Sequence, residues 1–145
     1  MIKELVKDKE ILSARCERAT PEDAPIAQDL IDTLASIEDG ACLAANQIGI
    51  TKQIGVYLDK DKKDEEKRPH VLYNPHLMMG LGAKRGEETC LSHEENSTVM
   101  RYTKVKVSFD ELVDGEFVER RHDFTGWTAQ MVQHIIDYSD RKSVV

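Results

Sequence analysis

Cysteine and histidine are the residue types of this sequence that best suit metal chemistry, Cys90 and His134 among them, since thiolate and imidazole are common ligands of zinc and similar ions. Tyr138 follows His134 by four residues, and side chains four apart on a helix lie one above the other on the same face. A phenol with a pKa near 10 is a poor ligand at neutral pH, so packing or a hydrogen bond is the simpler role for Tyr138. A buried thiol and a packed core imidazole are the ordinary alternatives for Cys90 and His134.

The cysteine pattern narrows the kind of site to be expected. Cys16, Cys42 and Cys90 are an odd number and show no C-x-x-C spacing, which argues against a disulfide framework or a structural zinc module. For Cys16 and Cys42 a small, semi-buried apolar side chain is a sufficient interpretation.

Length, charge and hydropathy set the class of protein. The 145 residues fit one domain, residues 1–145, that can bury a core without covalent staples. The net charge of −7 and the scattered basic residues without interleaved aromatics argue against nucleic acid as a partner. No apolar run approaches the roughly 18 residues of a membrane span, and the charged N-terminus contains no apolar signal core. We therefore expect a cytoplasmic protein with no membrane partner.

The elements that must position these residues begin with a helix. Thr20 and Pro21 are typical of a helix start, and Asp23 can face the unpaired amides of the first turn. Apolar residues then recur at helical spacing, so one face must pack against the rest of the domain. Gly40 is the expected end of this helix.

A series of strands is predicted after that helix. Ile54, Val56 and Leu58 alternate as in a half-buried strand, and the charged run 59–68 is predicted to be a solvated loop. A short strand over 70–73 is expected to stop at a turn formed by Asn74 and Pro75.

The second half of the chain predicts a hairpin and a terminal helix. The alternation of Val105, Val107 and Phe109 leads to Asp114-Gly115, a hairpin signal. A last helix is expected over 127–138, with Ala129, Val132 and Ile136 on its buried face. The separation of strands from helices favours an α+β fold with antiparallel strands packed around a C-terminal helix and an N-terminal amphipathic helix.

Three short segments carry a resemblance to a known family. Residues 40–49 read GACLAANQIG, residues 88–92 read ETCLS, and residues 133–138 read QHIIDY. In order and spacing they resemble the three signatures of the peptide deformylases, G-x-G-x-A-A-x-Q, E-G-C-L-S and Q-H-E-x-D-H. The sequence departs from them at four positions: Cys42, Thr89, Ile135 and Tyr138.

The resemblance implies a metal-dependent amidase that removes the formyl group from N-formylmethionine at the start of new bacterial chains. The family's metal is usually iron(II), with zinc or nickel as substitutes. Cys90 and His134 match two of its three metal ligands, and Tyr138 stands at the place of the third, a histidine. Three such ligands leave a fourth place for a water that becomes hydroxide near neutral pH.

Other residues match supporting positions of the family. Gln47, together with the backbone amide of Leu91, would hold the formyl oxygen as negative charge builds on it. Gly40 and Leu43 match substrate-binding positions. Glu88 would support the site through an ion pair, for which Arg101 is the candidate; two solvated charges are the alternative.

Cys42 and Thr89 add side chains where glycine normally lets the backbone come close, which would narrow the substrate channel. Asp137, three residues past His134, is expected to orient that imidazole.

Ile135 is the most consequential departure, because the family's glutamate at this place takes the proton of the attacking water and passes it to the leaving amine. An isoleucine side chain can do neither. Loss of a general acid/base typically costs about 10²–10⁴ in rate, roughly 3–5 kcal/mol of barrier.

Three hypotheses follow. The favoured one is a deformylase homologue that is inactive or strongly impaired, with or without a bound metal, and that still binds a methionine-led or formyl-methionine peptide. The second is an active hydrolase with a rewired ligand set, in which His93, Glu94 or Glu95 replaces the missing ligand. The third is a non-catalytic interaction protein that kept only the scaffold.

Overall fold

The structure, a computed structural model, describes residues 2–5, 16–37, 41–58, 68–89 and 96–139, and of residues 84–89, 96–100 and 139 the backbone alone. Its five strands form one antiparallel sheet in the order β1-β2-β3-β4-β5. The elements, in chain order, are η1 (Pro21–Asp23), α2 (Ala24–Ala35), β1 (Cys42–Ala44), η2 (Ala45–Ile48), β2 (Ile54–Leu58), β3 (Pro69–Thr89), β4 (Asn96–Val113), β5 (Glu116–Thr125) and α3 (Gly126–Ser139). The predicted α+β fold is confirmed.

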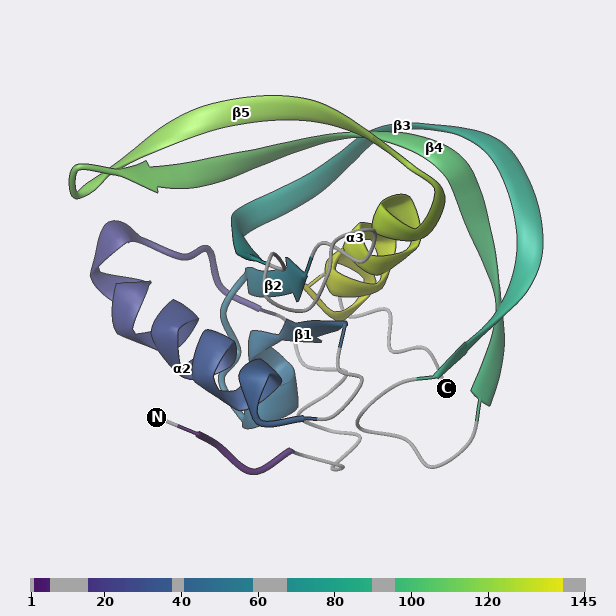
Figure 1. The fold of residues 1–145 in the computed structure, drawn as a ribbon. Coiled ribbons are helices and arrows are strands. Elements are labelled where there is room, and N and C mark those ends of the chain that lie inside the picture. Colours follow the sequence, from purple (N-terminus) through teal and green to yellow (C-terminus); the bar gives the residue numbers. More distant parts are fainter. Residues whose placement is uncertain (1, 6–15, 38–40, 59–67, 90–95, 140–145) are drawn as a thin grey trace.

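The long strands β3, β4 and β5 curve over α3, while α2 lies beside the short strands β1 and β2 (Figure 1). Among the described residues this arrangement gives two large apolar cores and a small third cluster of Ala44 and Tyr138. One joins α3 to the inner face of the curved sheet and includes Val105, Phe124 and Val132. The other joins α2 to β1 and β2 and includes Leu30 and Leu43. No helix in the described part of the chain is long and apolar enough to span a membrane.

The first helix begins where the sequence predicts and ends earlier than expected. The N–H of Thr20 donates to the Asp23 carboxylate at 2.8 Å, which ties the chain back onto the first turn. The helix stops at Ala35, not at Gly40, because Ser36 closes it: the Ser36 hydroxyl donates to the Thr33 carbonyl at 2.6 Å. Gly40 itself lies outside the described residues.

Strand β2 is buried on both faces, so the prediction of a half-buried strand is wrong. Ile54 and Val56 pack into the core of α2, whereas Tyr57 packs into the core of α3. Two helices on opposite sides of one strand remove the polar face that an alternating pattern would otherwise imply. Residues 59–67 of the predicted charged loop lie outside the described part, and Arg68 is exposed.

The predicted turn at Asn74-Pro75 is also wrong, because β3 runs through it. Asn74 adopts a left-handed backbone conformation with φ 52°, and the pairing of β3 with β4 shifts register between Tyr73 and His76. These are the features of a β-bulge, which bends a strand without ending it. The side chain of Asn74 stabilises the bulge by hydrogen bonds to both backbone polar groups of Ala19, at 2.7 Å and 3.1 Å.

The hairpin and the terminal helix are confirmed. Asp114 and Gly115 both have positive φ, 51° and 81°, as a two-residue hairpin turn requires. Helix α3 then begins at Gly126 and buries the predicted face, Ala129, Val132 and Ile136.

Candidate functional site

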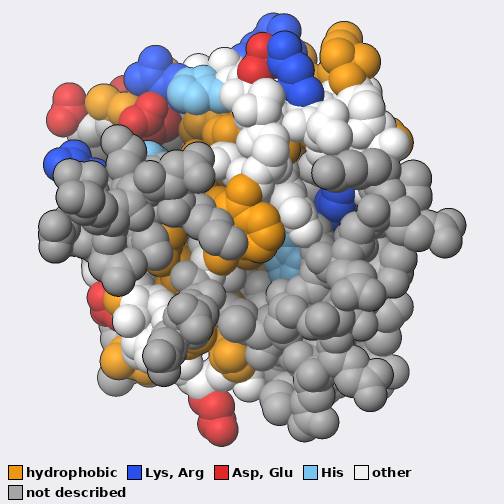
Figure 2. Space-filling view, turned by 45° about the vertical axis from the view of Figure 1, so that its right-hand side comes forward, with side chains coloured by type: hydrophobic (Ala, Val, Ile, Leu, Met, Phe, Trp, Pro, Cys, Tyr) orange, Lys and Arg blue, Asp and Glu red, His pale blue; other side chains and the backbone are white. Residues whose placement is uncertain are grey.

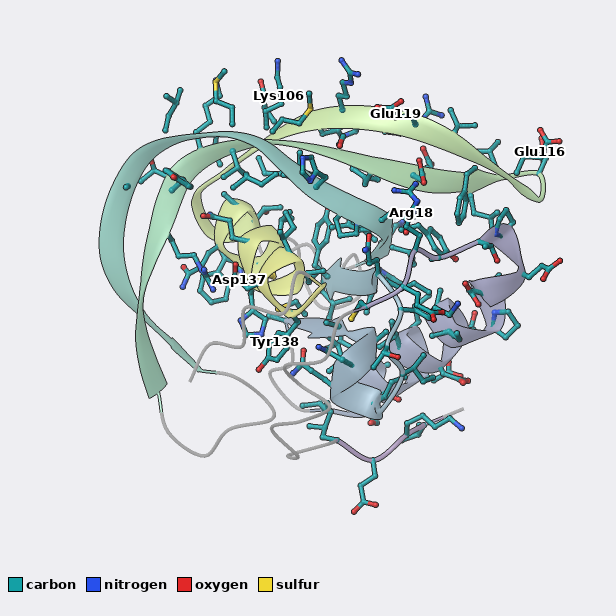
Figure 3. The ribbon with its side chains drawn as sticks, turned by 180° about the vertical axis from the view of Figure 1, so that it is seen from behind. Arg18, Lys106, Glu116, Glu119, Asp137 and Tyr138 are labelled. Atoms are coloured by element: carbon teal, nitrogen blue, oxygen red, sulfur yellow. The ribbon has the colours of Figure 1, made fainter. Side chains whose placement is uncertain are left out.

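Helix α3 carries the third signature segment, and almost all of that segment is buried. The exposed fraction of His134 is 6%, and that of Ile135 and Tyr138 is 0%. Asp137 points from α3 toward the curved strands, and Tyr138 lies near the end of the helix (Figure 3). The segment is therefore part of the interior of the protein.

His134 and Tyr138 lie on one face of α3, as their spacing predicts. Their rings meet edge to face, with centroids 4.9 Å apart and an interplanar angle of 63°. The backbone carbonyl of Tyr138 accepts a hydrogen bond from the Asn46 side chain at 3.1 Å, and the Cys16 thiol lies 3.8 Å from the same oxygen. The tyrosine is thus packed against the imidazole beside it.

Ile135 packs against the backbone of β2. A Cβ atom placed on Gly55 would lie 2.2 Å from Cγ2 of Ile135, so the isoleucine occupies the space that a side chain at position 55 would need. The position that holds the catalytic glutamate in the family signature is therefore filled by a fully buried aliphatic group in contact with the core.

Gln133 and Asp137 connect the same helix to β4. The Gln133 amide accepts from the Tyr102 N–H at 2.9 Å and donates to the Tyr102 carbonyl at 3.0 Å. The Asp137 carboxylate receives a hydrogen bond from the Arg101 guanidinium at 2.6 Å, in an ion pair whose side chains are 21% and 10% exposed. The role of Asp137 in orienting His134 stays a prediction beside this ion pair.

The predicted partner of Arg101 was Glu88. Strand pairing places the backbone of Glu88 opposite Ser97, while Lys84 lies opposite Arg101. Because the Glu88 side chain lies outside the described set, an ion pair between Glu88 and Arg101 also stays a prediction.

Gln47 and Leu43 lie close together in sequence at the start of the sheet, and both have an exposed fraction of 0%. Gln47 sits on η2, and its side-chain oxygen accepts from the Ala44 N–H at 3.0 Å. Leu43 belongs to the α2 core. The proposed roles of Gln47 in holding an oxyanion and of Leu43 in holding substrate remain predictions.

The remaining predicted site residues are not part of the described chain. They are Gly40, Cys90 and Leu91, together with the replacement ligands considered above, His93, Glu94 and Glu95. Within the described ranges, no group of three or more His, Cys, Asp or Glu side chains is placed to hold a metal ion. Of the donors that the family signature requires, these ranges contain His134 alone, with a phenol packed on its ring. The described residues therefore do not fit a three-ligand metal centre by themselves.

A space-filling view shows the face that comes forward when the molecule is turned (Figure 2). Hydrophobic side chains are exposed near the middle of this face, and small parts of a histidine and of a basic side chain are visible beside them.

Sequence reasoning missed three residues that hold this segment: Asn46, Gly55 and Tyr102. Asn46 lies inside the first signature segment, next to Gln47, which is a signal that it contributes to the same region. Gly55 is an isolated glycine in an alternating strand pattern, and such a glycine often marks a close approach of another group. Tyr102 contributes through its backbone, which leaves no signal in the sequence.

Comparison with known proteins shows to which family the sequence is similar. Residues 2–144 match the family model described as polypeptide deformylase. A peptide deformylase of Clostridium beijerinckii is 34% identical over 139 residues, which are 95% of this chain and 96% of that protein.

Solved structures give the same result for the fold. A peptide deformylase from Legionella pneumophila superposes with a TM-score of 0.84 at 28% identity, over 99% of this chain and 84% of that one. A class I type b peptide deformylase from Acinetobacter baumannii, solved with Met-Ala-Ser bound, superposes with a TM-score of 0.83 over 99% of this chain and 97% of that one. Its sequence identity is 21%, so this likeness concerns the fold alone.

Proposed function

Because this chain belongs to the peptide deformylase family, we propose that it is a homologue in which removal of formyl groups from N-formylmethionine peptides is lost or strongly impaired. We propose further that it still binds methionine-led peptides, in a cytoplasmic, bacterial setting. The peptide proposal is supported by the family's action on formyl-methionine peptides.

The burial of Ile135 against Gly55 is the observation that carries this proposal. A general base must reach the proton that it takes, within hydrogen-bond distance or through one water. The side chain at position 135 has no group that can accept a proton, has an exposed fraction of 0%, and lies in van der Waals contact with β2. The rate factor of about 10²–10⁴ that a general acid/base supplies should therefore be missing.

Tyr138 marks the loss of a second functional group, the histidine that binds the metal in the family. Its ring lies edge-on to His134 at a centroid distance of 4.9 Å, in the place where the family has a metal-binding imidazole. Loss of a direct ligand should weaken metal retention by more than the roughly 10–100-fold seen when only the groups that orient ligands are removed. The described donors do not by themselves fit the family's metal centre.

We infer that peptide binding does not depend on the two lost groups. Gln47 is retained in a fully buried position on η2, and the strand β1 that precedes it is intact. We infer that the scaffold can hold a methionine side chain and an extended backbone even where hydrolysis fails, since binding and catalysis use different contacts.

Restoration of both lost groups tests the proposal. Formate release from formyl-Met-Ala is measured for the wild type, for Ile135→Glu, for Tyr138→His and for the double variant, each loaded anaerobically with iron(II). The double variant should be at least about 10²-fold faster than the wild type, with both single variants slow, because ligand and base act as one unit. Wild-type turnover equal to that of the double variant would contradict the proposal.

A matched control separates proton transfer from packing. Ile135→Gln combined with Tyr138→His has the size and polarity of the restored pair but no group that carries a proton at neutral pH, so it should release formate no faster than the wild type. Calorimetric titration with Met-Ala-Ser tests the binding half of the proposal. No heat of binding in the folded wild type would favour a protein that keeps only the scaffold.

A further inference from the structure

We propose that helix α3 is held in place by contacts within the protein alone, centred on the packing of Ile135 against Gly55, so that its position does not require a bound metal. This inference concerns the attachment of the helix, and it stands or falls independently of whether the protein hydrolyses formyl peptides.

Attachments hold the signature segment along its whole length. At position 133 the side-chain amide forms two hydrogen bonds with the Tyr102 backbone, of 2.9 Å and 3.0 Å. At position 138 the backbone carbonyl accepts a hydrogen bond from the Asn46 side-chain amide at 3.1 Å. These bonds join α3 to β4 at one point and to η2 at another, so the helix is fixed to two elements that lie far apart in the sequence.

An ion pair adds a second attachment of α3 to β4. Asp137 and Arg101 meet at 2.6 Å with side chains only 21% and 10% exposed, and such partly buried pairs are screened less by salt than surface pairs. The carboxylate that follows His134 by three residues is thereby engaged with a cation of the protein itself.

His134 and Tyr138 pack against each other at the two helix positions that are metal ligands in the family signature. The Tyr138 ring covers one edge of the His134 imidazole, and Tyr138 has an exposed fraction of 0%. Ring packing therefore links these two positions without a bridging ion.

Ile135 fills the space beside Gly55 that a side chain at position 55 would need. A Cβ atom on Gly55 would lie 2.2, 3.1 and 3.2 Å from Cγ2, Cγ1 and Cβ of Ile135, distances that real Cβ atoms do not tolerate or tolerate poorly. The isoleucine and the glycine therefore depend on each other: the branched side chain fits only because position 55 lacks one.

Hydrogen exchange of the α3 amides in the intact protein tests whether the helix needs a metal. Exchange is measured after exhaustive treatment with a chelator and again with zinc added. Protection factors in α3 should agree within about two-fold between the two states. A fall of ten-fold or more in the chelated protein, confined to α3, would overturn the inference. An active, metal-loaded wild type whose α3 stays protected after chelation would contradict the proposed function and leave this inference standing.

A double-mutant cycle tests the central contact. Ile135→Leu keeps the side-chain volume but removes the branch at Cβ that meets position 55. Gly55→Ala alone should lower the midpoint of thermal unfolding markedly, Ile135→Leu alone should lower it little, and the double variant should be more stable than Gly55→Ala. Additive effects would overturn the proposed contact. If Gly55→Ala alone fails to fold, recovery of folded protein in the double variant supports it, and failure of both contradicts it.

Gly80→Ala is the control for the cycle. A Cβ atom at position 80 would also be crowded, but by the Tyr102 ring at 2.3 Å and not by Ile135. Combined with Ile135→Leu, it should show additive changes in the unfolding midpoint. Rescue of Gly80→Ala by Ile135→Leu would mean that the leucine stabilises the protein generally, which would remove the support for a specific contact.

Discussion

The side-chain amide of Gln133 pairs with both backbone polar groups of Tyr102, accepting from its N–H at 2.9 Å and donating to its carbonyl at 3.0 Å. The same amide nitrogen also donates to the carbonyl of Ala129 at 2.9 Å. A helix side chain thus pairs with the strand backbone as a neighbouring strand would. This pairing fixes the position of α3 along β4. The glutamine of the third signature therefore has a structural task, distinct from the chemistry of the residues that follow it.

Replacement of Gln133 by leucine should destabilise the protein. The variant keeps the apolar stem but leaves the Tyr102 N–H and carbonyl without their side-chain partner, so we expect a loss of about 2–3 kcal/mol in the free energy of unfolding. Urea titration followed by circular dichroism measures this. Gln28→Leu is the control, since Gln28 makes an exposed hydrogen bond within α2, and it should change stability by no more than about 0.5 kcal/mol. Equal effects of the two variants would contradict the structural task of Gln133.

The ion pair between Arg101 and Asp137 should show a measurable coupling energy. In a double-mutant cycle with Arg101→Met and Asp137→Leu, we expect about 1–3 kcal/mol of coupling, because both side chains are mostly removed from water. The exposed pair of Arg120 and Glu111, at 2.8 Å, is the control and should couple by less than about 0.5 kcal/mol. Coupling near zero at the buried pair would mean that Arg101 is stabilised by other partners.

Asn74 should be sensitive to two different substitutions in a predictable order. Its side chain bonds Ala19 twice and donates to the Asp110 carboxylate at 3.0 Å, while its backbone adopts φ 52°. Asn74→Gly keeps the backbone conformation and loses the hydrogen bonds, for an expected cost of about 2–4 kcal/mol.

Asn74→Ala should cost about 1–2 kcal/mol more than Asn74→Gly, because an alanine resists positive φ. Both free energies come from the same urea titration. The opposite order, with alanine more stable than glycine, would show that the bulge relaxes to an ordinary strand conformation when the asparagine is absent.

The environment of Tyr73 should lower the free energy of unfolding at high pH. Burial, followed by the nearby Asp23 carboxylate, raises the pKa of the Tyr73 hydroxyl above its ordinary value near 10. A group whose pKa is higher in the folded state stabilises the fold below the unfolded pKa, and this contribution is lost as pH rises from about 10 through the folded pKa. The free energy of unfolding should therefore decline less steeply above about pH 10 in Tyr73→Phe than in the wild type. Identical slopes would contradict the raised pKa.

The elements that local chemistry determines were predictable from the sequence. Asp114-Gly115 forms the expected hairpin turn because both residues accept positive φ, and the start of the first helix follows from Thr20 and Asp23. The bulge at Asn74 could not be predicted, since it depends on hydrogen bonds to Ala19, 55 residues away. The same holds for β2, whose second buried face exists only because α3 packs on Gly55.

For the candidate site, the sequence predicted which residue types stand at the signature positions, but it did not predict what those residues contact. The absence of a proton-carrying group at Ile135 and of a second imidazole at Tyr138 follows from the signature segment alone. Their surroundings do not, because Asn46 is 92 residues from Tyr138 and Tyr102 is 31 residues from Gln133. Whether a substituted position is open to solvent or closed by packing is a property of the tertiary structure.

The central claim is tested most directly by the metal content of the purified wild-type protein. An X-ray fluorescence scan across the iron, nickel and zinc edges measures this content, and formate release from formyl-Met-Ala is measured on the same sample. With Ile135 buried on Gly55 and Tyr138 packed on His134, we predict well under one ion per chain and turnover at least about 10²-fold below that of the Ile135→Glu and Tyr138→His double variant. One tightly held ion per chain, with formate released as fast as by the double variant, would contradict it.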